Sequence, residues 1–438
     1  MKKLFGTDGI RGIFNEDLTE DLAYKVGVAI GRMHSEGKFL IVRDTRESGL
    51  ALERAIAQGL VKSGATVYLG GILPTPAAAL ITKIKNWFGV VISASHNPYY
   101  YNGIKLMKSG FKLADEEEEK IEKEIELGDY SSSNSNHITG KIIDLPEIKD
   151  IYVQRIVEMF SDVDLGGISV AVDASNGAAY KTTPMVLERL GIKVTCYCNE
   201  PNGKNINDNC GSLYPQYLAQ KVTDFDLGIL HDGDADRCIL LSKEGKEING
   251  DKIMGIVAVY MKKESRLKNN LLVATIMSNL GLELFLKENQ IEMIRTRVGD
   301  RYVLEQMLKS DANIGGERSG HIIFLDRSTT GDGLITALEF LRVMALSGKD
   351  SSELEKQVSD LPQYMINVEM HDKTVADDPQ LKEKVSQLQK NGFRIVVRAS
   401  GTEPVIRIMA EGQDPAKTKV VAEQIADFVK ALRGYQRG

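Results

Sequence analysis

Short apolar runs that alternate with longer helical patterns constrain the fold of this 438-residue chain more than any other feature. Runs without polar alternation are typical of strands that are covered on both faces, as in α/β sheets. They lie at residues 39–42, 66–69, 88–93, 169–173, 271–275 and 293–296. Between them, residues 50–62 and 333–346 carry apolar side chains at the three- and four-residue spacing of amphipathic helices. The alternation predicts an α/β protein with mostly parallel sheets.

The pattern divides the chain into three similar α/β units and one different unit. The second unit contains the strand that begins at residue 169, and the third contains the strand that begins at residue 271. After residue 362 we expect a helix at 375–390, strands at 393–398 and 405–411, and a closing helix at 420–432. We therefore predict α/β domains at residues 1–152, 153–250 and 251–362 and a smaller α+β domain at 363–438.

Charge and composition exclude several classes of protein. The net charge of −6 lacks the electrostatic signature of a nucleic-acid binder. No apolar run approaches the roughly 18 residues of a membrane-spanning helix, and residues 1–8 have no apolar segment of a secretory signal. Four cysteines make no disulfide framework, and we expect packing roles for all four, with Cys196 and Cys198 on a buried strand. A soluble cytoplasmic protein is the expectation.

An alternating triplet of aspartates is the strongest local signal for chemistry. It lies in His231-Asp-Gly-Asp-Ala-Asp-Arg237, after a strand-like run at 227–230. Carboxylates at 232, 234 and 236 can converge on one hard cation, which would also relieve their mutual repulsion. The alternative is a solvated acidic turn. An EF-hand loop is excluded because Arg237 and Lys243 stand where it needs Gly and Glu, and a haloacid-dehalogenase motif is excluded because its Thr position holds Asp236.

A serine follows the buried strand of the first unit. It lies in Ser93-Ala-Ser-His-Asn-Pro98, and Asn102-Gly-Ile-Lys105 comes soon after. Reacting groups of α/β folds lie at the carboxyl ends of strands, and His96 or Lys105 could activate the hydroxyl of Ser95. The alternative is an Asx-Pro turn with a structural serine.

Two further loops carry groups that suit a phosphorylated sugar. In Gly315-Gly-Glu-Arg-Ser-Gly-His321, side chains can hydrogen-bond sugar hydroxyls, although an ordinary hairpin is the alternative. In Arg398-Ala-Ser-Gly-Thr-Glu-Pro404, followed by Arg407, small residues and arginines form a phosphate cradle, although a turn without a ligand is the alternative. The second loop lacks the Lys-Ser/Thr ending of a nucleotide P-loop. Together the four loops indicate phosphoryl transfer on a sugar phosphate.

These four segments, in this order, resemble the α-D-phosphohexomutase superfamily over essentially the whole chain. The segment at residues 43–49 matches the superfamily too. Within the superfamily the chain most resembles the bacterial phosphoglucosamine mutases, on the segments at residues 6–12, 205–212, 298–303 and 329–333. The resemblance implies three similar mixed α/β domains around a central cleft and a smaller C-terminal α+β domain.

Residue by residue, the resemblance implies the following roles. Ser95 matches the serine that is phosphorylated in the active enzyme, and Asp232, Asp234 and Asp236 match the Mg²⁺ ligands, with a phosphoserine oxygen completing the set. Arg237 matches a phosphate contact, and Arg11, His96 and Lys105 match positions for proton transfer and charge stabilisation. Glu317, Ser319 and His321 match the residues that recognise the sugar. The residues that bind the second phosphate, the one not being transferred, are matched by Arg398, Ser400, Gly401, Thr402 and Arg407.

The implied reaction interconverts glucosamine 6-phosphate and glucosamine 1-phosphate through a bound sugar 1,6-bisphosphate, which would feed UDP-N-acetylglucosamine and cell-wall precursor synthesis. Lys105 is our candidate proton shuttle, its amine made more available by cations such as Arg11, and His96 is the alternative. The partner is a small-molecule hexosamine phosphate, with no nucleic acid and no membrane, bound by a monomer or homodimer.

The chain departs from the family pattern at two positions. Tyr101 stands where these enzymes commonly carry Asp, and Arg318 adds a cation to the sugar loop. Three other functions stay open at this point: a phosphomannomutase/phosphoglucomutase with the same chemistry, a non-catalytic sugar-phosphate sensor and a nonspecific phosphatase.

Overall fold

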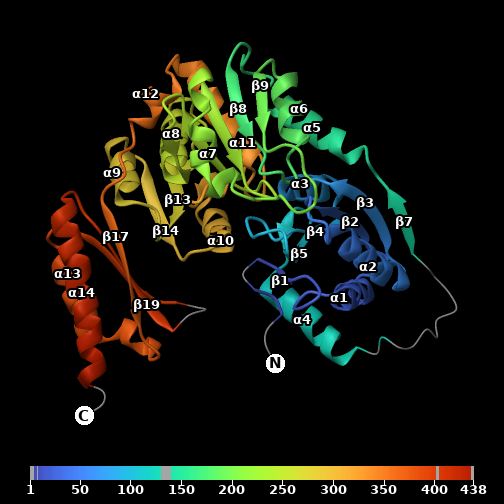
Figure 1. Cartoon of the computed structure of the whole chain (residues 1–438), viewed down its shortest axis with the longest axis horizontal. Coiled ribbons are helices and arrows are strands. Elements are labelled where there is room, and N and C mark those ends of the chain that lie inside the picture. The colour runs from blue at the N-terminus through green and yellow to red at the C-terminus, as the bar shows by residue number, and fades with distance from the viewer. Residues whose placement is uncertain (1–3, 7, 129, 131–139, 401–403, 436–438) are drawn as a thin grey trace. The chain divides into compact units, whose positions relative to one another are not determined.

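The structure is a computed structural model that describes residues 4–6, 8–128, 130, 140–400 and 404–435, and every structural statement below concerns these residues. The chain forms two compact units (Figure 1). One comprises residues 1–275 and 294–357, and the other comprises residues 276–293 and 358–438. No helix of the described chain is both long enough and apolar enough to cross a bilayer.

The first sheet of the larger unit has seven strands in the order β1-β5-β4-β2-β3-β7, with β6 paired to β5. The strands are β1 (Ile10–Ile13), β2 (Lys38–Arg43), β3 (Thr66–Ile72), β4 (Phe88–Ile92), β5 (Tyr101–Lys108), β6 (Phe111–Lys112) and β7 (Lys141–Asp144). The helices of this region are α1 (Glu20–Met33), α2 (Gly49–Lys62), α3 (Thr75–Lys85), α4 (Asp115–Leu127) and α5 (Ile148–Met159). The predicted strands at 39–42, 66–69 and 88–93 are confirmed, each within a few residues.

Strand β2 shows why the apolar runs are unbroken. Phe39 and Ile41 belong to the core formed with α1 and α2, while Leu40 and Val42 point to the opposite face, on which α3 packs. All four side chains are at most 1% exposed. A strand covered by helices on both faces has no polar position, as the sequence pattern predicts.

Two further sheets complete the larger unit. The second has the order β12-β11-β10-β8-β9, and the third has the order β14-β13-β15-β16. Their strands are β8 (Ser169–Asp173), β9 (Lys193–Tyr197), β10 (Leu227–His231), β11 (Cys238–Ser242), β12 (Glu247–Ile248), β13 (Leu271–Thr275), β14 (Glu292–Thr296), β15 (Ile314–Gly316) and β16 (Ile322–Phe324). The helices beside them are α6 (Thr182–Arg189), α7 (Pro215–Ala219), α8 (Gly250–Lys263), α10 (Asp300–Ser310), α11 (Gly333–Ser347) and α12 (Ser351–Glu355), with 3₁₀ turns η1 (Gly211–Leu213), η2 (Val222–Asp224) and η3 (Lys268–Asn270).

The three sheets are mixed, so the expectation of mostly parallel sheets is wrong at one end of each. β2 pairs in parallel with β3 and β4, and β8 pairs in parallel with β9 and β10, but β4–β5, β10–β11 and β15–β16 are antiparallel. Each antiparallel pair is joined by a short loop, at residues 93–100, 232–237 and 317–321. Loops of this length cannot make a parallel crossover, which takes a dozen or more residues. These three loops contain the predicted serine, aspartate and sugar-recognition motifs.

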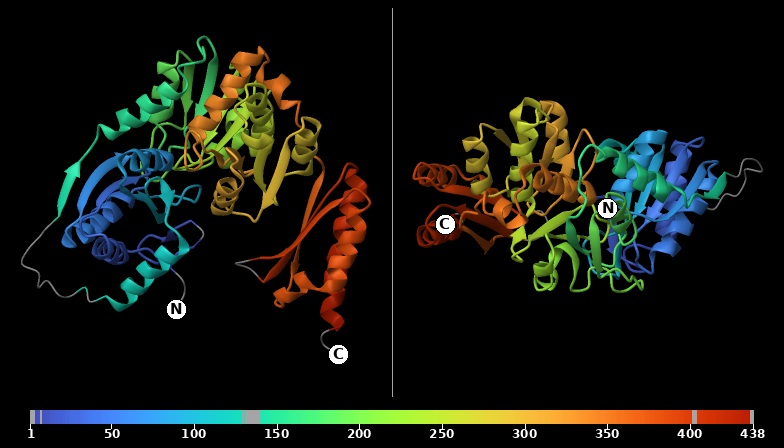
Figure 2. Two further views of the ribbon diagram at one scale, coloured as in Figure 1. Left: turned by 180° about the vertical axis from the view of Figure 1, so that it is seen from behind. Right: turned by 90° about the horizontal axis from the view of Figure 1, so that it is seen from above.

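The smaller unit contains an antiparallel sheet in the order β17-β19-β18. Its elements are α9 (Leu280–Glu288), β17 (Gln363–Glu369), η4 (Lys373–Asp377), α13 (Pro379–Gln389), β18 (Arg394–Ala399), β19 (Val405–Glu411) and α14 (Pro415–Tyr435). Figure 2 shows α14 lying along this sheet, against which it packs.

Sequence analysis missed β17 and misplaced one helix start. The predicted helix at 375–390 begins only at Pro379, because the Asp378 side chain accepts hydrogen bonds from the N–H groups of Gln380 and Leu381 and caps the helix there. The chain before Asp378 forms the separate turn η4.

The cysteine expectation is also wrong in part. Cys196 lies on β9 but is half-buried, because β9 is an edge strand whose side chains are partly exposed. Cys198 follows the end of β9, is half-buried as well and has a φ of +45°. Neither lies on a strand that is buried on both faces.

Candidate active site

Ser95 occupies a buried turn immediately after β4. Its φ is +52°, an uncommon conformation for a residue with a side chain. The turn is held by a short relay in which the Ser95 N–H donates to Ser93 Oγ at 2.9 Å and Ser93 Oγ donates to Asp44 Oδ2 at 2.7 Å. Because Ser95 is only 1% exposed, these contacts fix its hydroxyl in one place within the protein.

The guanidinium of Arg46 organises the rest of this loop. Its side chain is fully buried and pairs with Asp44 at 2.7 Å. Its remaining N–H groups donate to the backbone carbonyls of Ser95 at 2.9 Å, Asn97 at 2.8 Å and Tyr101 at 2.9 Å, and to that of Pro98. A planar fork with five donors suits this task, which a lysine could not perform. Sequence analysis noted the segment at 43–49 only as part of the resemblance and missed this role.

The aspartate triplet lies directly beside the serine. Asp232, Asp234 and Asp236 follow β10, are buried, and offer carboxylate oxygens that all lie within 4.8 Å of one another. Ser95 Oγ donates to Asp232 Oδ2 at 2.7 Å. In the described part of the chain, the Oδ1 atoms of Asp234 and Asp236 are buried without a hydrogen-bond partner. Oxygen ligands with unused lone pairs suit Mg²⁺, so the residues present fit the expected metal.

A glycine allows the two loops to touch. A Cβ atom at Gly233 would lie 2.5 Å from the carbonyl oxygen of Ser95, closer than any real Cβ contact. The metal loop therefore packs on the serine loop without a side chain between them. This close approach is what permits the contact between Ser95 and Asp232.

Repulsion among the three carboxylates of the triplet affects their pKa values. Burial, together with the neighbouring charges of Asp236 and Asp234, raises the pKa of Asp232 to about 7. Burial opposes ionisation of Asp236 too, but Lys105 and His321 hold its pKa well below the usual range. One carboxyl of the three is thus left without enough positive charge, which a divalent cation would provide.

Lys105, on β5, supplies the buried positive charge next to the triplet. Its Nζ lies 2.8 Å from Asp234, 3.0 Å from Asp8 and 3.5 Å from Asp236. Burial opposes the charge, but these carboxylates hold the pKa of Lys105 well above its usual range. The expectation that Arg11 makes this amine more available is therefore wrong, because the effect of three closer carboxylates exceeds that of one arginine.

His96 has the opposite electrostatic surroundings. Its Nδ1 lies 3.3 Å from Ser95 Oγ. Burial, Arg237 and Arg11 lower the pKa of His96 to about 4. The imidazole is therefore neutral near pH 7 in the absence of a bound phosphate.

Three residues that sequence analysis did not single out connect the triplet to the sugar loop. Lys112 Nζ lies 2.5 Å from Asp8 and contacts Asp300, and Asp300 lies 3.6 Å from His321 Nε2. His321 Nδ1 lies 3.6 Å from Asp236. The only signal for Asp8 and Asp300 was their place in the segments at 6–12 and 298–303, and nothing pointed to Lys112.

A cavity of about 400 Å³ opens beside these groups. Its wall combines the cations Arg11, Lys112 and Arg237 with four carboxylates and two histidines, although the chain as a whole is acidic. The residues that line it are Leu4, Gly6, Asp8, Gly9, Arg11, His96, Lys112, Asp236, Arg237, Val298, Gly299, Asp300, Glu317 and His321. They come from all three sheets of the larger unit, so loops far apart in sequence share one cavity.

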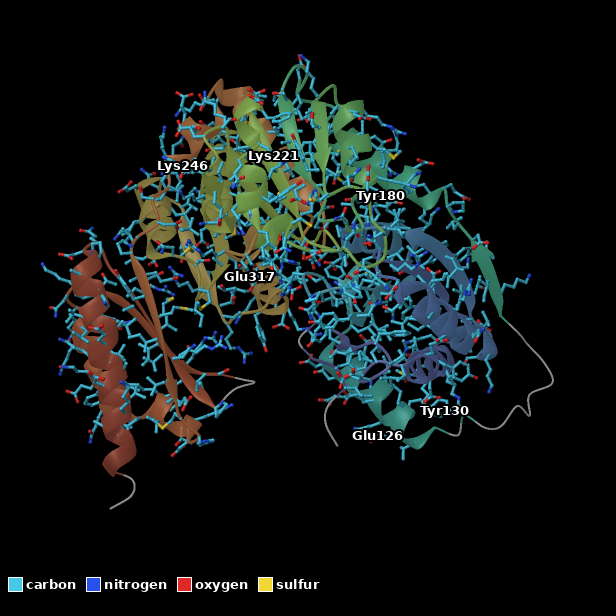
Figure 3. The ribbon with its side chains drawn as sticks, in the orientation of Figure 1. Glu126, Tyr130, Tyr180, Lys221, Lys246 and Glu317 are labelled. Carbon is cyan, nitrogen blue, oxygen red and sulfur yellow. The ribbon has the colours of Figure 1, made fainter. Side chains whose placement is uncertain are left out.

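The predicted sugar loop contributes two of its three residues. Glu317, labelled in Figure 3, is half-buried and accepts a hydrogen bond from the Gly299 N–H at 3.1 Å. His321 is buried at the cavity wall, whereas Ser319 is exposed and does not line the cavity. Arg318 lies 3.3 Å from the buried Asp251 on α8, so this extra cation is not part of the wall either.

The predicted phosphate cradle belongs to the smaller unit. Arg398 on β18 lies directly opposite Arg407 on β19, and burial together with Arg407 lowers the pKa of Arg398. Like charges opposite one another are unfavourable, and an anion bound between them would relieve that cost. Ser400 is buried, and its carbonyl accepts a hydrogen bond from Lys373 at 2.6 Å, a cation that sequence analysis missed. Gly401 and Thr402 lie outside the described residues.

Comparison with known proteins identifies relatives that match nearly the whole chain. Models of the phosphoglucomutase/phosphomannomutase family match in four parts: α/β/α domain I at residues 2–131, domain II at 150–245, domain III at 249–361 and the C-terminal domain at 365–428. The phosphoglucosamine mutase of Thermosipho africanus is 49% identical over 98% of both chains, and that of Thermotoga neapolitana is 50% identical over 98% of this chain and 99% of the other. The chain belongs to the phosphoglucosamine mutase family. Its members are isomerases of the phosphohexomutase superfamily, so the predicted family and enzyme class are confirmed.

Solved structures confirm the fold class. A phosphoglucomutase/phosphomannomutase family protein from Burkholderia thailandensis aligns with a TM-score of 0.83 at 24% identity and covers 100% of this chain and 98% of its own. The N-acetylphosphoglucosamine mutase of Aspergillus fumigatus, solved with GlcNAc-6P and magnesium, aligns with a TM-score of 0.65 at 18% identity over 97% of this chain and 95% of its own. Our domain boundaries at 152/153, 250/251 and 362/363 stay a prediction.

The Arg46 contacts generate a test of how the serine loop is held. Arg46→Lys keeps the charge beside Asp44 but loses the donors to four carbonyls, so we expect a loss of about 1–3 kcal/mol in unfolding free energy and a fall in mutase activity. Denaturant unfolding and a coupled mutase assay measure the two effects. Arg54→Lys, at an exposed position on α2, is the matched control and should change neither. Wild-type behaviour of Arg46→Lys would show that the carbonyl contacts do not position Ser95.

Proposed function

We propose that this protein interconverts glucosamine 6-phosphate and glucosamine 1-phosphate by passing a phosphoryl group between Ser95 and the sugar. The observation that carries the proposal is the contact of 2.7 Å between Ser95 Oγ and Asp232, beside two further buried carboxylates and a cavity whose wall includes three cations. A hydroxyl, a metal site and an anion-binding wall are the components that phosphoryl transfer requires.

In the proposed reaction the phosphorylated Ser95 is the donor. A free hydroxyl of the sugar phosphate attacks phosphorus, the bond from phosphorus to Ser95 Oγ breaks, and the proton of the attacking hydroxyl leaves. The product of this half-reaction is a sugar 1,6-bisphosphate and an unmodified serine. After the bisphosphate turns end for end, the same steps in reverse return the other phosphoryl group to Ser95.

Asp232, Asp234 and Asp236 are the residues that would hold Mg²⁺. When bound there, the ion supplies neutralisation of the charge on the transferring group. The protein's own cations Arg11 and Arg237 line the same cavity and would bind phosphate oxygens.

We assign the proton to His96 rather than to Lys105. The imidazole lies 3.3 Å from Ser95 Oγ, the oxygen that leaves phosphorus, so its proposed step is to protonate that oxygen, with the proton that the attacking hydroxyl releases restoring the balance. Lys105 is paired with three carboxylates and does not line the cavity. Its proposed role is to keep the metal ligands ionised and in place.

Substrate recognition is divided between the remaining loops. Glu317 and His321 line the cavity and would bind the sugar's polar groups, including the ammonium of glucosamine, and Ser319 could join them only by moving from its exposed position. The loop with Arg398, Ser400, Gly401, Thr402 and Arg407 is the proposed grip for the phosphate that is not transferred. A relative of similar fold was solved with a hexosamine phosphate and magnesium, which is the ligand pair proposed here.

Ser95→Ala tests the central step. The variant should fold normally, because only one buried hydroxyl group is removed, yet interconversion should fall by more than about a thousandfold. A coupled assay gives the rate, and intact mass shows whether the wild type carries one phosphoryl group that disappears on incubation with substrate. Ser109→Ala, at a turn near the end of β5, is the control. Substantial turnover by Ser95→Ala would remove Ser95 from the mechanism.

Substitutions at Lys105 and His96 separate charge from proton transfer. Lys105→Arg keeps the cation and should stay within about tenfold of wild type, whereas Lys105→Ala should lose about a hundredfold or more. His96→Gln keeps polarity but cannot carry the proton, and we expect a similar hundredfold loss in kcat. If Lys105 moved the proton, Lys105→Arg would be as inactive as Lys105→Ala and activity would rise into the alkaline range, where this amine loses its charge.

A comparison of sugars tests the substrate. We expect kcat/KM on glucosamine phosphates to exceed that on glucose and mannose phosphates by at least about tenfold, as the family assignment implies. Equal or higher rates on mannose or glucose phosphate would replace the proposal with the phosphomannomutase/phosphoglucomutase alternative. Release of inorganic phosphate without isomerisation would indicate a phosphatase.

A further inference from the structure

A second group of metal-binding side chains lies outside the site described above. It consists of Asp173 at the end of β8, Cys198 just after β9 and Cys210 just before η1, hereafter the thiol cluster. One carboxylate oxygen and the two sulfur atoms lie within 4.8 Å of one another. Asp173 and Cys210 are buried and Cys198 is half-buried, so the cluster is internal with one side near solvent.

Backbone contacts hold the three side chains in position. The carboxylate of Asp173 accepts hydrogen bonds from the N–H groups of Ser175 at 2.8 Å and Gly211 at 2.9 Å, one on each oxygen. The carbonyl of Cys198 accepts from the Asn176 N–H at 2.6 Å, which fixes the residue in its left-handed conformation. Outer contacts that orient donors in this way are characteristic of built metal sites.

The thiol cluster carries a buried acid without a basic partner. Asp173 is fully buried and accepts hydrogen bonds from backbone N–H groups, and no lysine or arginine of the described chain forms an ion pair with it. The nearby Lys221, labelled in Figure 3, instead places its ammonium over the rings of Tyr197 and Tyr217, 5.3 and 5.0 Å from their centroids. Negative charge gathered here therefore has no counter-charge from the protein.

The third donor distinguishes a metal site from a redox pair. Two adjacent thiols alone could form a disulfide, but a carboxylate beside them adds a third donor, which a disulfide does not use and a divalent cation does. A bound cation stabilises the two thiolates and the carboxylate together. Soft sulfur donors select zinc-like ions over Mg²⁺, which prefers oxygen alone.

We propose that Asp173, Cys198 and Cys210 form a binding site for one thiophilic divalent cation of the Zn²⁺ type. The half-exposed side of Cys198 leaves a fourth position for water. Binding displaces the thiol protons, so affinity rises with pH.

The cation would fasten a loop that supports the catalytic serine. Cys198 and Cys210 flank residues 199–209, and Asn207 in this loop donates its side-chain N–H groups to the carbonyls of Ser95 at 2.9 Å and Asn97 at 3.1 Å. The Asn207 N–H also donates to the Ser175 carbonyl at 2.9 Å. Occupancy of the thiol cluster would therefore stabilise the segment that holds Ser95, without any contact with the substrate cavity.

Titration of the reduced, chelator-treated full-length chain with Co²⁺ tests the proposal, with Mg²⁺ present to occupy the aspartate triplet. We expect one Co²⁺ per chain and an absorption band from sulfur-to-metal charge transfer, which oxygen ligands at the triplet cannot produce. Zn²⁺ should displace the band and raise the Tm. Cys198→Ser and Cys210→Ser should abolish the band, and Asp173→Asn should weaken affinity at least about tenfold, because a direct ligand contributes no less than an outer contact.

Cys196→Ser is the matched control, since Cys196 lies two residues away and is not part of the cluster. It should keep both the band and the rise in Tm, as should Cys238→Ser. No band in the wild type, an equal band in Cys198→Ser, or a Cys198–Cys210 disulfide together with no Co²⁺ uptake by the reduced chain would overturn the proposal. Circular dichroism confirms that each variant is folded. Because the absorption band and the Tm are independent of mutase activity, this test can fail without affecting the proposed reaction, and the reverse is also true.

Discussion

The buried ammonium of Lys105 is the interaction on which the candidate active site depends. It lies between carboxylates of two segments more than 200 residues apart, Asp8 near the start of the chain and the triplet after β10. Each of these carboxylates is costly to bury, and their mutual repulsion adds to that cost. The ammonium held among them offsets part of that cost. Lys105 occupies that place from the rigid strand β5 rather than from a flexible loop.

The topology of the sheets explains why the reacting groups meet. In each of the three sheets a parallel region ends at one strand, and a loop of five to eight residues then reverses the chain into an antiparallel neighbour. The serine loop, the aspartate loop and the sugar loop are these reversals. A short loop between two paired strands has little freedom, which suits groups that must keep distances of about 3 Å. The same arrangement used three times gives three loops of different chemistry around one cavity.

Much of the fold could be predicted from local pattern, because strands buried on both faces and amphipathic helices leave unmistakable periodicities. Strands β8, β13 and β19 and helices α2 and α11 were predicted within two residues of their ends. β5 was missed because its residues 102–105 look like a polar motif rather than a strand, and β17 was missed because its burial alternates irregularly in an edge position. The antiparallel ends at β4–β5 and β10–β11 were not foreseen because β5 and β11 were not recognised as strands, although the short loops before them permit only antiparallel pairing.

The same limit on prediction from local sequence applies to the candidate active site. The aspartate triplet and Ser95 were found because the chemistry is concentrated in a few adjacent residues. The Lys112 contacts with Asp8 and Asp300 were not found, since each partner is an ordinary charged residue until the fold brings them together. For the same reason the predicted direction of the Lys105 pKa shift was wrong. A pKa depends on all charges within a few ångströms, and the sequence pointed only to the neighbouring arginine.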